Sequence, residues 1–570
     1  MQEIELKFQI PADALAAVRA ELARLAPDQT LPGPLILQAA YFDTPDRRLA
    51  QARSALRVRR EGDDWVQTLK AAGSHTMVRV EDNRATQPPP AGQPLSPRLS
   101  LHAGGQAEAA LRQSLAWQPE QDADGAHCGL VQLYATDMVR TRVQVRVGVG
   151  TLHEGLVEVA LDEGAILAGT GPAQRSVPVR ELEIELISGH PQAVIDAGRE
   201  WVQRFGLWLD TQTKAHRGDR LARWAVDGDA RAALPESSSP RPARLPATGL
   251  ASLSAEAAWR AGVEACLAHI TAHMSELAGL PEDDLSAAAP VAYQWRRGLR
   301  RLRALGRFVT DAQAHGAPLT LPPVAHLALQ DACSHAAVLA RQLGHWRDAD
   351  ALAWIPRKLQ RLGLPALAVP TLPAPEGFPA SPMAAARSTQ ATELCLQVLT
   401  ALLAEHTDTA GAPSATSQGP APHGPQGEAL SAHDWLSAGL HRWHGQCARQ
   451  ARRFADLGPS ATHRLRRRAR QLRDVHDLFA PLWTQPEEPH AQLTHKTHKA
   501  LSDHGHALAK ALAALGQQQD ETVALTRYRS VVMQDIRAQA ACAWLMARRK
   551  PSRKKARRAL RRWLRCSAPW

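Results

Sequence analysis

Short segments in which polar and apolar residues alternate dominate the first 226 residues of the chain. A period of two places successive side chains on opposite faces of an extended strand. Two other segments, 11–25 and 191–205, repeat their apolar residues at helical spacing and have long polar faces. We therefore expect one antiparallel sheet or barrel with a few helices packed outside it. The predicted strands cover residues 3–8, 55–60, 65–70, 77–84, 136–147, 156–162 and 180–186.

The pattern changes after residues 227–249, which are rich in proline, serine and alanine and are typical of a linker. From 250 to 545 the apolar residues recur at spacings of three and four, which predicts an all-α domain. A glycine- and proline-rich stretch at 406–432 predicts a flexible insert, and residues 546–570 form a basic tail. The predicted fold class is α+β multidomain, with the antiparallel β domain over residues 1–226.

The helical part contains a weak internal repeat. Two sets of four residues have the same offsets of 0, 3, 7 and 10. About fifty residues further on, each set is followed by a similar motif, LGHWRD at 343–348 and LGQQQD at 515–520. Two copies of one four-helix unit are the simplest interpretation. The first set is Tyr293, Arg296, Arg300 and Arg303, and the second is His463, Arg466, Arg470 and Arg473.

The charge is divided unevenly along the chain. Residues 1–228 contain 25 Lys and Arg against 29 Asp and Glu, whereas the remainder contains 43 against 27. The overall net charge of +12 is therefore the balance of a slightly acidic part and a strongly basic one. A basic surface predicts a polyanionic partner, and DNA, RNA, acidic lipid and polyphosphate satisfy that requirement equally well.

Cysteine usage and hydropathy indicate the compartment. The seven cysteines are widely scattered and never form a CxxC pair, which argues against a disulfide framework and against a zinc site. The N-terminus MQEIELKFQI does not have the pattern of a signal peptide, and we find no run of about 18 apolar residues. We expect a cytoplasmic protein without a transmembrane segment.

One face of the predicted strands gathers carboxylates and cations together. Glu3, Glu5 and Lys7 share a face of the first strand, because side chains two residues apart point the same way. The last predicted strand, 180–186, places three glutamates on one face, where they repel one another unless solvent or a cation intervenes. If the sheet closes with this face inside, divalent cations and a multiply charged oxyanion would lie side by side, as phosphoryl transfer requires.

The N-terminal half resembles a known family in its motifs. Glu3, Glu5 and Lys7 match the ExExK signature of the CYTH superfamily, also called triphosphate tunnel metalloenzymes. The resemblance covers about 220 residues and implies an eight-stranded antiparallel tunnel that hydrolyses triphosphate compounds with Mg²⁺ or Mn²⁺. The further matching motifs are YFDTPDRRL, ALRVRR, WVQTLK, RVEDN, TDMVRTR, EVALDEG, ELEIELISG and KAHRG, in that order.

This resemblance also implies roles for individual residues, with Glu5 and Lys7 expected to act in catalysis. Asn83 stands where a carboxylate is common in the family. The implied metal ligands are Glu3, Glu5, Glu183 and Glu185, with Glu81, Glu158, Asp162 and Glu181 nearby. The implied phosphate-binding residues are Lys7, Arg57, Arg59, Lys70, Arg79, Arg140, Arg142, Lys214 and Arg217.

The helical half carries two basic stripes at helical spacing. Together with the LGHWRD and LGQQQD motifs, they resemble the CHAD domain, a helical module found attached to CYTH domains. This resemblance implies two four-helix bundles that bind inorganic polyphosphate. Tyr293 replaces the usual histidine of the first copy, and Asp474 replaces an expected tyrosine. The implied polyphosphate-binding residues are Arg296, Arg300, Arg303, Arg307, His463, Arg466, Arg470 and Arg473.

Several functions fit these features. The leading hypothesis is metal-dependent hydrolysis of inorganic triphosphate, with the helical domain binding polyphosphate. Thiamine triphosphate hydrolysis and cyclisation of ATP, as in class IV adenylate cyclases, are alternatives within the same fold. A non-catalytic protein that binds polyphosphate or nucleic acid is a third, although binding a polyanion alone needs no carboxylates. The tail at 546–570 suits polyphosphate, RNA or an acidic membrane equally.

Overall fold

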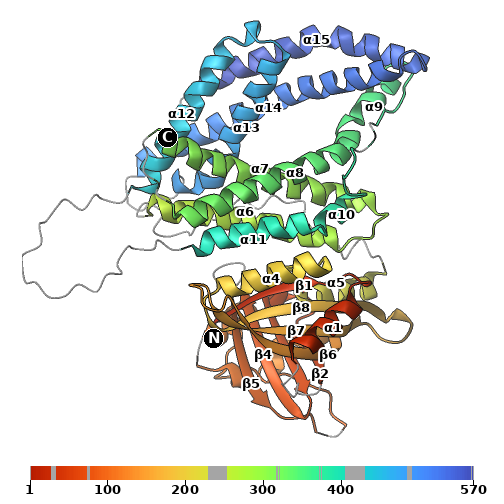
Figure 1. Ribbon diagram of the computed structural model, residues 1–570, viewed down its shortest axis with the longest axis vertical. Coiled ribbons are helices and arrows are strands. Elements are labelled where there is room, and N and C mark those ends of the chain that lie inside the picture. Colours follow the sequence, from red (N-terminus) through yellow and green to blue (C-terminus); the bar gives the residue numbers. More distant parts are fainter. Residues whose placement is uncertain are drawn as a thin grey trace, which may run out of the picture. The chain divides into compact units, whose positions relative to one another are not determined.

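The computed structural model forms two compact units (Figure 1). The tunnel unit comprises Met1–Ser239, Thr271–Leu280 and Ala386–Leu403, and the helical unit comprises Pro240–Ile270, Pro281–Ala385 and Ala404–Trp570. The predicted linker and insert lie largely outside the described residues. The described residues are 2–26, 34–72, 78–90, 92–104, 106–228, 253–315, 319, 321–371, 373, 375–404, 430–483, 491–566, 568 and 570.

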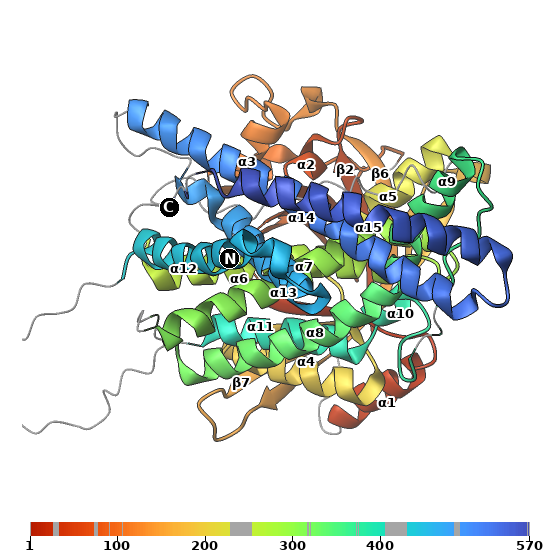
Figure 2. The ribbon, with the colours of Figure 1, turned by 90° about the horizontal axis from the view of Figure 1, so that it is seen from above.

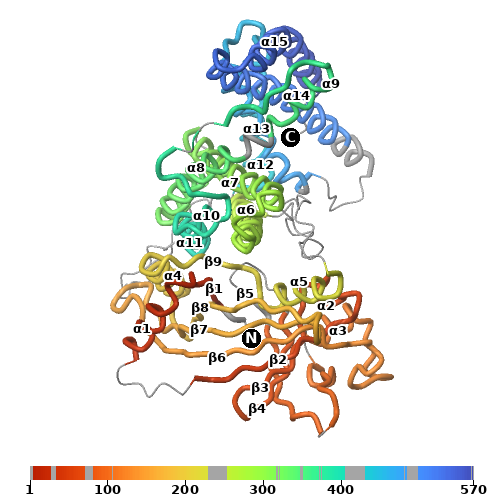
Figure 3. The backbone as a smooth tube through the Cα atoms, turned by 90° about the vertical axis from the view of Figure 1, so that its right-hand side faces the viewer, coloured from red at the N-terminus to blue at the C-terminus, as the bar shows by residue number. Residues whose placement is uncertain are grey.

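Antiparallel strands in the order β5-β4-β3-β2-β6-β7-β8-β1-β9 make up the sheet of the tunnel unit (Figure 3). An additional pairing between β5 and β1 closes eight of these strands into a ring, and β9 extends β1 on the outside. The strands are β1 Gln2–Gln9, β2 Leu35–Asp43, β3 Ser54–Glu61, β4 Asp64–Ala72, β5 Val78–Thr86, β6 Val131–Val147, β7 Gly155–Ala168, β8 Arg175–Gly189 and β9 Trp208–Leu209.

Apolar side chains alternate with the charged ones along these strands and form the core outside the ring. Leu182 and Ile184 of β8 are fully buried, and they lie between the glutamates that point to the other face. The helix α4, Gln192–Phe205, packs against β8 and β1. Gly198 permits this approach, because a Cβ atom there would lie 2.7 Å from the ring of Phe8.

Further helices pack against the sheet. They are α1 Leu15–Leu25, α2 Arg48–Gln51, α3 Gln106–Leu115 and α5 Lys214–Asp227. The position of α5 matters for the site, because its first turn carries Lys214 and Arg217. Gly218 follows them and faces Tyr134 of β6 so closely that a Cβ atom would lie 2.2 Å from the tyrosine ring. The small residue therefore lets α5 settle against the sheet with its basic end at the tunnel.

A helix from far along the sequence also belongs to the tunnel unit. It is α11, Thr389–Leu403, which packs against α4 and β9. The hydroxyl of Thr392 accepts a hydrogen bond of 3.0 Å from the buried amide of Leu209, and Arg199 forms an ion pair of 3.0 Å with Glu393. The tunnel unit is thus completed by residues that follow the predicted linker by more than a hundred positions.

The secondary-structure elements after α5 are helices, which confirms the predicted class of an antiparallel β domain followed by an all-α region (Figure 2). Among the described helices, none combines the length and the apolar character that a bilayer span requires. The helices are α6 Ala255–Ala278, α7 Leu285–Ala314, α8 Pro323–Leu352, α9 Trp354–Arg361, α10 Pro382–Ala386, α12 Ala432–Arg452, α13 Pro459–Phe479, α14 Ala491–Val531 and α15 Ile536–Trp563.

Most of the predicted basic tail lies within α15, which runs beside α14 (Figure 2). Ala556, Leu560 and Trp563 on one side of α15 are buried. The indole Nε1 of Trp563 donates a hydrogen bond of 2.9 Å to Nε2 of the buried His504 on α14. The basic segment is therefore anchored to the helical unit along one face and exposes its charges on the other.

Candidate active site

Three neighbouring strands bring predicted site residues together inside the ring. β8 pairs with β1 so that Glu183 lies opposite Lys7. On its other side β8 pairs with β7, which places Glu181 opposite Asp162. Because side chains two residues apart share a face, these residues all point to the inside of the closed sheet.

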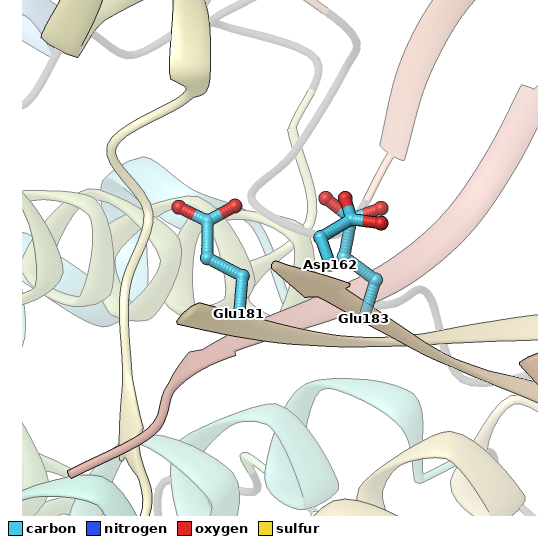
Figure 4. Close-up of side chains that lie close together, drawn as sticks. All are labelled: Asp162, Glu181 and Glu183. Atoms are coloured by element: carbon cyan, nitrogen blue, oxygen red, sulfur yellow. The ribbon is translucent and has the colours of Figure 1, made fainter. Parts of the chain in front are cut away.

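An acidic cluster forms where β7 meets β8. One carboxylate oxygen from each of Asp162, Glu181 and Glu183 lies within 4.8 Å of the others. Figure 4 shows the carboxylates of Asp162 and Glu183 next to each other, with Glu181 on the same side of the sheet. The side chains of Asp162 and Glu181 are fully buried, and that of Glu183 is 17% exposed. Three buried carboxylates at this separation require cations to compensate their charge.

Lys214 of α5 supplies one of those cations. Its ammonium lies 2.8 Å from Asp162, 2.7 Å from Glu181 and 2.7 Å from Glu183. Burial opposes the charge of Lys214, but the three carboxylates outweigh that effect and raise its pKa well above the ordinary value. The hydroxyl of Thr213 caps α5 by accepting a hydrogen bond from the amide of His216, which fixes the start of the helix.

Two arginines also compensate the negative charge of the three carboxylates. The guanidinium of Arg140 binds Asp162 through two hydrogen bonds of 2.6 and 2.7 Å and also contacts Glu183 at 2.5 Å. Arg217 lies 2.5 Å from Glu181. Burial disfavours the ionised form of Glu183, but the attraction of Lys214 and Arg140 is larger and holds its pKa well below the ordinary value. Glu183 is therefore ionised throughout the neutral pH range.

A second group of charges lies on the strands β3, β4 and β5. Lys70 approaches Glu81 at 2.6 Å, and Arg57 lies 3.6 Å from the same carboxylate. Arg59 forms an ion pair with Glu61 at the end of β3. This group presents more positive than negative charge to the tunnel, which is the arrangement that a bound polyanion requires.

The helical unit contains a basic groove with a volume of about 510 Å³. Arg296 and Arg303 of α7 line it together with His463 and Arg466 of α13. These residues come from the two sets of the internal repeat, so the repeat brings its basic stripes to one groove. Gln519 and Asp520 from the LGQQQD motif also line it.

Equivalent glycines receive equivalent arginines in the two copies. A Cβ atom on Gly344 of LGHWRD would lie 3.4 Å from the guanidinium of Arg296. A Cβ atom on Gly516 of LGQQQD would lie 3.4 Å from the guanidinium of Arg466. The second motif of each copy therefore lies in contact with the arginine that the first motif supplies.

Two models of known families match separate stretches of the chain. A model of the CYTH domain matches residues 1–218, and a model of the CHAD domain matches residues 261–507. The protein joins a CYTH domain to a CHAD domain.

Relatives of known name match single parts of the chain. An inorganic triphosphatase from Haemophilus influenzae is 27% identical over 220 residues, which are 38% of this chain and 54% of the relative. The chain thus spans about half the length of that curated relative. The CHAD domain from the plant Ricinus communis is similar over 57% of this chain and 96% of its own, with 19% identity and a TM-score of 0.36. A Hippeastrum protein described as having a dominant triphosphatase activity covers 37% of this chain and 90% of its own, with 21% identity and a TM-score of 0.24.

The predicted CYTH residues fall into three groups in the structure. Those gathered around the acidic cluster are Lys7, Arg140, Asp162, Glu181, Glu183, Lys214 and Arg217. Arg57, Lys70 and Glu81 form the second group, with Arg59 beside them on β3. The third group surrounds Glu185 of β8, which lies between Glu5 of β1 and Glu158 of β7. Glu5 is buried, and Glu158 forms an ion pair of 3.8 Å with Arg142. The side chains of Glu3 and Arg79 lie outside the described part of the chain.

Two polar residues of the CYTH site were missed by the sequence analysis. Gln9 donates hydrogen bonds to Glu181 at 2.9 Å and to Asp210 at 2.8 Å, and Lys7 lies 3.5 Å from Asp210. Gln9 is two residues after Lys7, so the strand alternation could have identified it. Asp210 lies just after the two-residue strand β9, where no periodic pattern exists to reveal it.

The acidic cluster suits a divalent cation. Its donors are three carboxylates, and oxygen donors are the ligands preferred by Mg²⁺ and Mn²⁺. Glu183 is the only one of the four preferred metal ligands within this cluster of described residues. The metal roles of Glu3, Glu5 and Glu185 stay predictions. Asn83, which stands where a carboxylate is common in the family, accepts a hydrogen bond of 2.7 Å from the hydroxyl of Thr68.

The other predicted polyphosphate-binding residues of the CHAD domain do not line the groove. Arg300 donates two hydrogen bonds to Asp474, at 2.6 and 2.9 Å, and Arg473 pairs with Asp477 at 3.2 Å. Arg470 has its pKa lowered to about 9, because burial and the neighbouring Arg466 and Arg300 disfavour its charge. Arg307 is exposed on α7 and does not line the groove.

Proposed function

We propose that the CYTH domain hydrolyses inorganic triphosphate to pyrophosphate and phosphate, with Mg²⁺ or Mn²⁺ held by Asp162, Glu181 and Glu183. The observation that carries this proposal is the acidic cluster on β7 and β8, which shares a closed sheet with the basic residues of β3 and β4. A polyanion-binding site alone would need no buried carboxylates. The similarity of 220 residues of the chain to an inorganic triphosphatase supports the choice of substrate.

The bound cation would supply charge neutralisation at the transferring phosphoryl group and activation of water. The chain's own residues do the rest. Lys70 and Arg57 are placed to bind the negatively charged phosphates, and Arg140 orients Asp162 and Glu183 through charge-assisted hydrogen bonds. Lys7, held by Glu181 and Asp210, keeps the base of the cluster in place. The closed ring of strands limits water around these charges and strengthens each interaction.

The test compares Glu183→Gln with a matched control on the same sheet. Glu163 follows Asp162 on β7 but pairs with Arg19 outside the ring, so Glu163→Gln changes the same charge away from the tunnel. Phosphate release would be measured with inorganic triphosphate, thiamine triphosphate, ATP and long-chain polyphosphate, with and without a divalent cation. We expect Glu183→Gln to lower the rate by roughly two to four powers of ten and Glu163→Gln to leave it near normal.

Each outcome of this panel separates the hypotheses. Full activity in the presence of a chelator would refute the metal assignment. Faster turnover of thiamine triphosphate, or formation of cyclic AMP from ATP, would select one of the alternative reactions. Absence of turnover with all four compounds would favour a non-catalytic binding protein.

We also propose that the CHAD domain binds inorganic polyphosphate in the groove lined by Arg296, Arg303, His463 and Arg466. The pair Arg296→Gln and Arg466→Gln should weaken binding and reduce its salt dependence, because each cation that neutralises a phosphate contributes to counterion release. A matched control pair is Arg357→Gln and Arg464→Gln, which are exposed and outside the groove. Equal losses in both pairs would show that the groove is not the site.

A cytoplasmic location is the further part of this proposal. All seven cysteines are free thiols in the structure, and Cys266, Cys395 and Cys447 are buried. Free buried thiols are the usual state of cysteine in a reducing compartment. Fractionation of cells that express the protein would test this location.

A further inference from the structure

A second basic groove lies between α14 and α15, beyond the residues that the CHAD family model matches. Its volume is about 370 Å³. Four cations line it, Lys510 from α14 and Lys555, Arg558 and Arg562 from α15, and the rest of its lining is Gln517 and three alanines. No carboxylate lines this groove.

The charge of the groove is not balanced within the described part of the chain. None of its four cations forms an ion pair with a described residue, and Lys555 instead donates a hydrogen bond of 2.8 Å to the amide oxygen of Gln517. Two acidic residues follow Gln517 on α14: Asp520 lines the first groove, and Glu521 is buried and pairs with Arg548 at 2.9 Å. Like charges three and four residues apart on a helix repel each other, so an anion in the groove would stabilise this arrangement.

The sequence of α15 shows the same bias. Residues 546–570 contain eleven Lys and Arg and no Asp or Glu. The apolar side of the helix, which includes Leu560 and Trp563, is already buried against the helical unit. Packing therefore accounts for the apolar residues of α15, and Arg548 and Arg553 bond to Glu521 and to the carbonyl of Leu457. Within the described part of the chain, no such contact holds the groove residues Arg558 and Arg562.

The chemistry of the groove favours one class of anion. Binding of single-stranded nucleic acid relies on aromatic side chains that stack on the bases, whereas the uncharged lining here is alanine and glutamine. An amphipathic helix that enters a membrane surface needs a free apolar face, and that face of α15 is buried. A linear polyphosphate has neither bases nor lipid tails, so its binding requires only positively charged side chains along the chain of phosphates.

We propose that the groove between α14 and α15 is a second binding site for inorganic polyphosphate. It shares its ligand with the function proposed for the CHAD groove but none of its lining residues. Both grooves use α14, since Gln519, Asp520 and Arg527 line the first groove and Lys510 and Gln517 line the second. At about 100° per residue, these two sets face directions about a third of a turn apart. One long polyphosphate chain that reaches both grooves binds more tightly than a short one, because the second contact is intramolecular.

The test uses the full chain and short-chain inorganic polyphosphate. The groove variant is Lys555→Gln, Arg558→Gln and Arg562→Gln. The matched control is Lys550→Gln, Arg557→Gln and Arg561→Gln, which removes one Lys and two Arg from exposed positions of the same helix outside the groove. Titrations at several salt concentrations should give two sites for the natural sequence and for the control, and one site for the groove variant. The log–log salt slope of the second site should be roughly 2 to 3, because each of these three cations contributes about 0.7 to 0.9 when it neutralises a phosphate.

A third variant separates this inference from the proposed CHAD function. Arg296→Gln with Arg466→Gln should remove the first site and leave the second. Loss of polyphosphate binding at each groove is therefore measured independently of the other. The inference is overturned if the groove variant keeps both sites, or if the control loses as much binding as the groove variant. It is also overturned if single-stranded RNA or vesicles with anionic lipid displace polyphosphate from the site that the groove variant removes.

Discussion

The ammonium of Lys214 lies 2.7 Å from a carboxylate oxygen of Glu183, and it contacts Asp162 and Glu181 at similar distances. A lysine in this position compensates the same three carboxylates that a divalent cation would use. If a divalent cation binds here as proposed, it would compete with Lys214 for the cluster, and Lys214 would have to move toward other anions. The phosphates of a substrate would provide such anions.

This competition gives the first prediction. Lys214→Met should raise the affinity for Mn²⁺ in the absence of substrate by about tenfold or more, since a charge that opposes the metal is removed. The same variant should bind triphosphate more weakly. Binding of Mn²⁺ can be followed by electron paramagnetic resonance, with Arg223→Met on the outer part of α5 as the control. An unchanged Mn²⁺ affinity in folded Lys214→Met would contradict the competition.

The second prediction concerns acid stability. Hydrogen bonds from Arg24 and Arg204 outweigh burial and lower the pKa of Glu21 to about 2, from an ordinary value of 4.5. A depressed pKa means that the stabilisation is complete above about pH 4.5 and is lost as the pH falls toward 2. Because the two arginines are 65% and 40% exposed, solvent screening limits the contribution of these ion pairs to the stability to about 1–2 kcal/mol.

Glu21→Gln should therefore lower the thermal midpoint at pH 7 and flatten its decline between about pH 5 and pH 3. Glu200→Gln is the control, because Glu200 also pairs with Arg204 but is 65% exposed. It should change the stability by less than about 1 kcal/mol. Parallel pH profiles for Glu21→Gln and the natural sequence would show that the pair of arginines does not stabilise Glu21.

Much of the tunnel could be predicted from strand alternation, and the exceptions have physical causes. β2, Leu35–Asp43, was not among the predicted strands, because its second half is buried on both faces and the alternation disappears. β9 is two residues long and too short for any periodic signal. The placement of α11 with α4 depends on contacts between residues far apart in the sequence, which a local pattern does not contain.

The contacts between the site residues were harder to predict than the face of the sheet on which these residues lie. Alternation placed Asp162 and Glu181 on inward faces, but their contact depends on the register of β7 against β8. Lys214 enters from α5, and only the resemblance to CYTH motifs indicated it. Sequence patterns therefore identified which residues face the tunnel, whereas strand register and helix packing determined which of them touch.

The third prediction tests the contribution of α11 to the tunnel unit. Thr392→Val keeps the shape of the side chain but removes the acceptor for the buried amide of Leu209. A buried N–H without a partner costs about 1–3 kcal/mol, so the variant should unfold at a lower temperature. Thr389→Val on the exposed start of the same helix is the control. A fragment of residues 1–404 should likewise be more stable than one of residues 1–228, and equal stability of the two fragments would contradict the role of α11.

The last prediction concerns the two hydrogen bonds from Arg300 to Asp474, which join α7 of the first repeat copy to α13 of the second. Asp474 is 5% exposed, so Arg300→Gln should leave a buried charge uncompensated and destabilise the helical unit by about 2–4 kcal/mol. Asp474→Asn added to Arg300→Gln removes that charge and should restore much of the loss.

Polyphosphate binding separates this structural role from a binding role. Because Asp474 already neutralises Arg300, and Arg300 does not line the groove, the double variant should bind polyphosphate nearly as well as the natural sequence. Arg296→Gln serves as the comparison, since Arg296 lines the groove and should lose affinity without a comparable loss of stability. Thermal unfolding and polyphosphate titration of the three variants supply both readouts. A double variant that is stable but no longer binds polyphosphate would place Arg300 at the ligand and overturn its assignment as the link between the two copies.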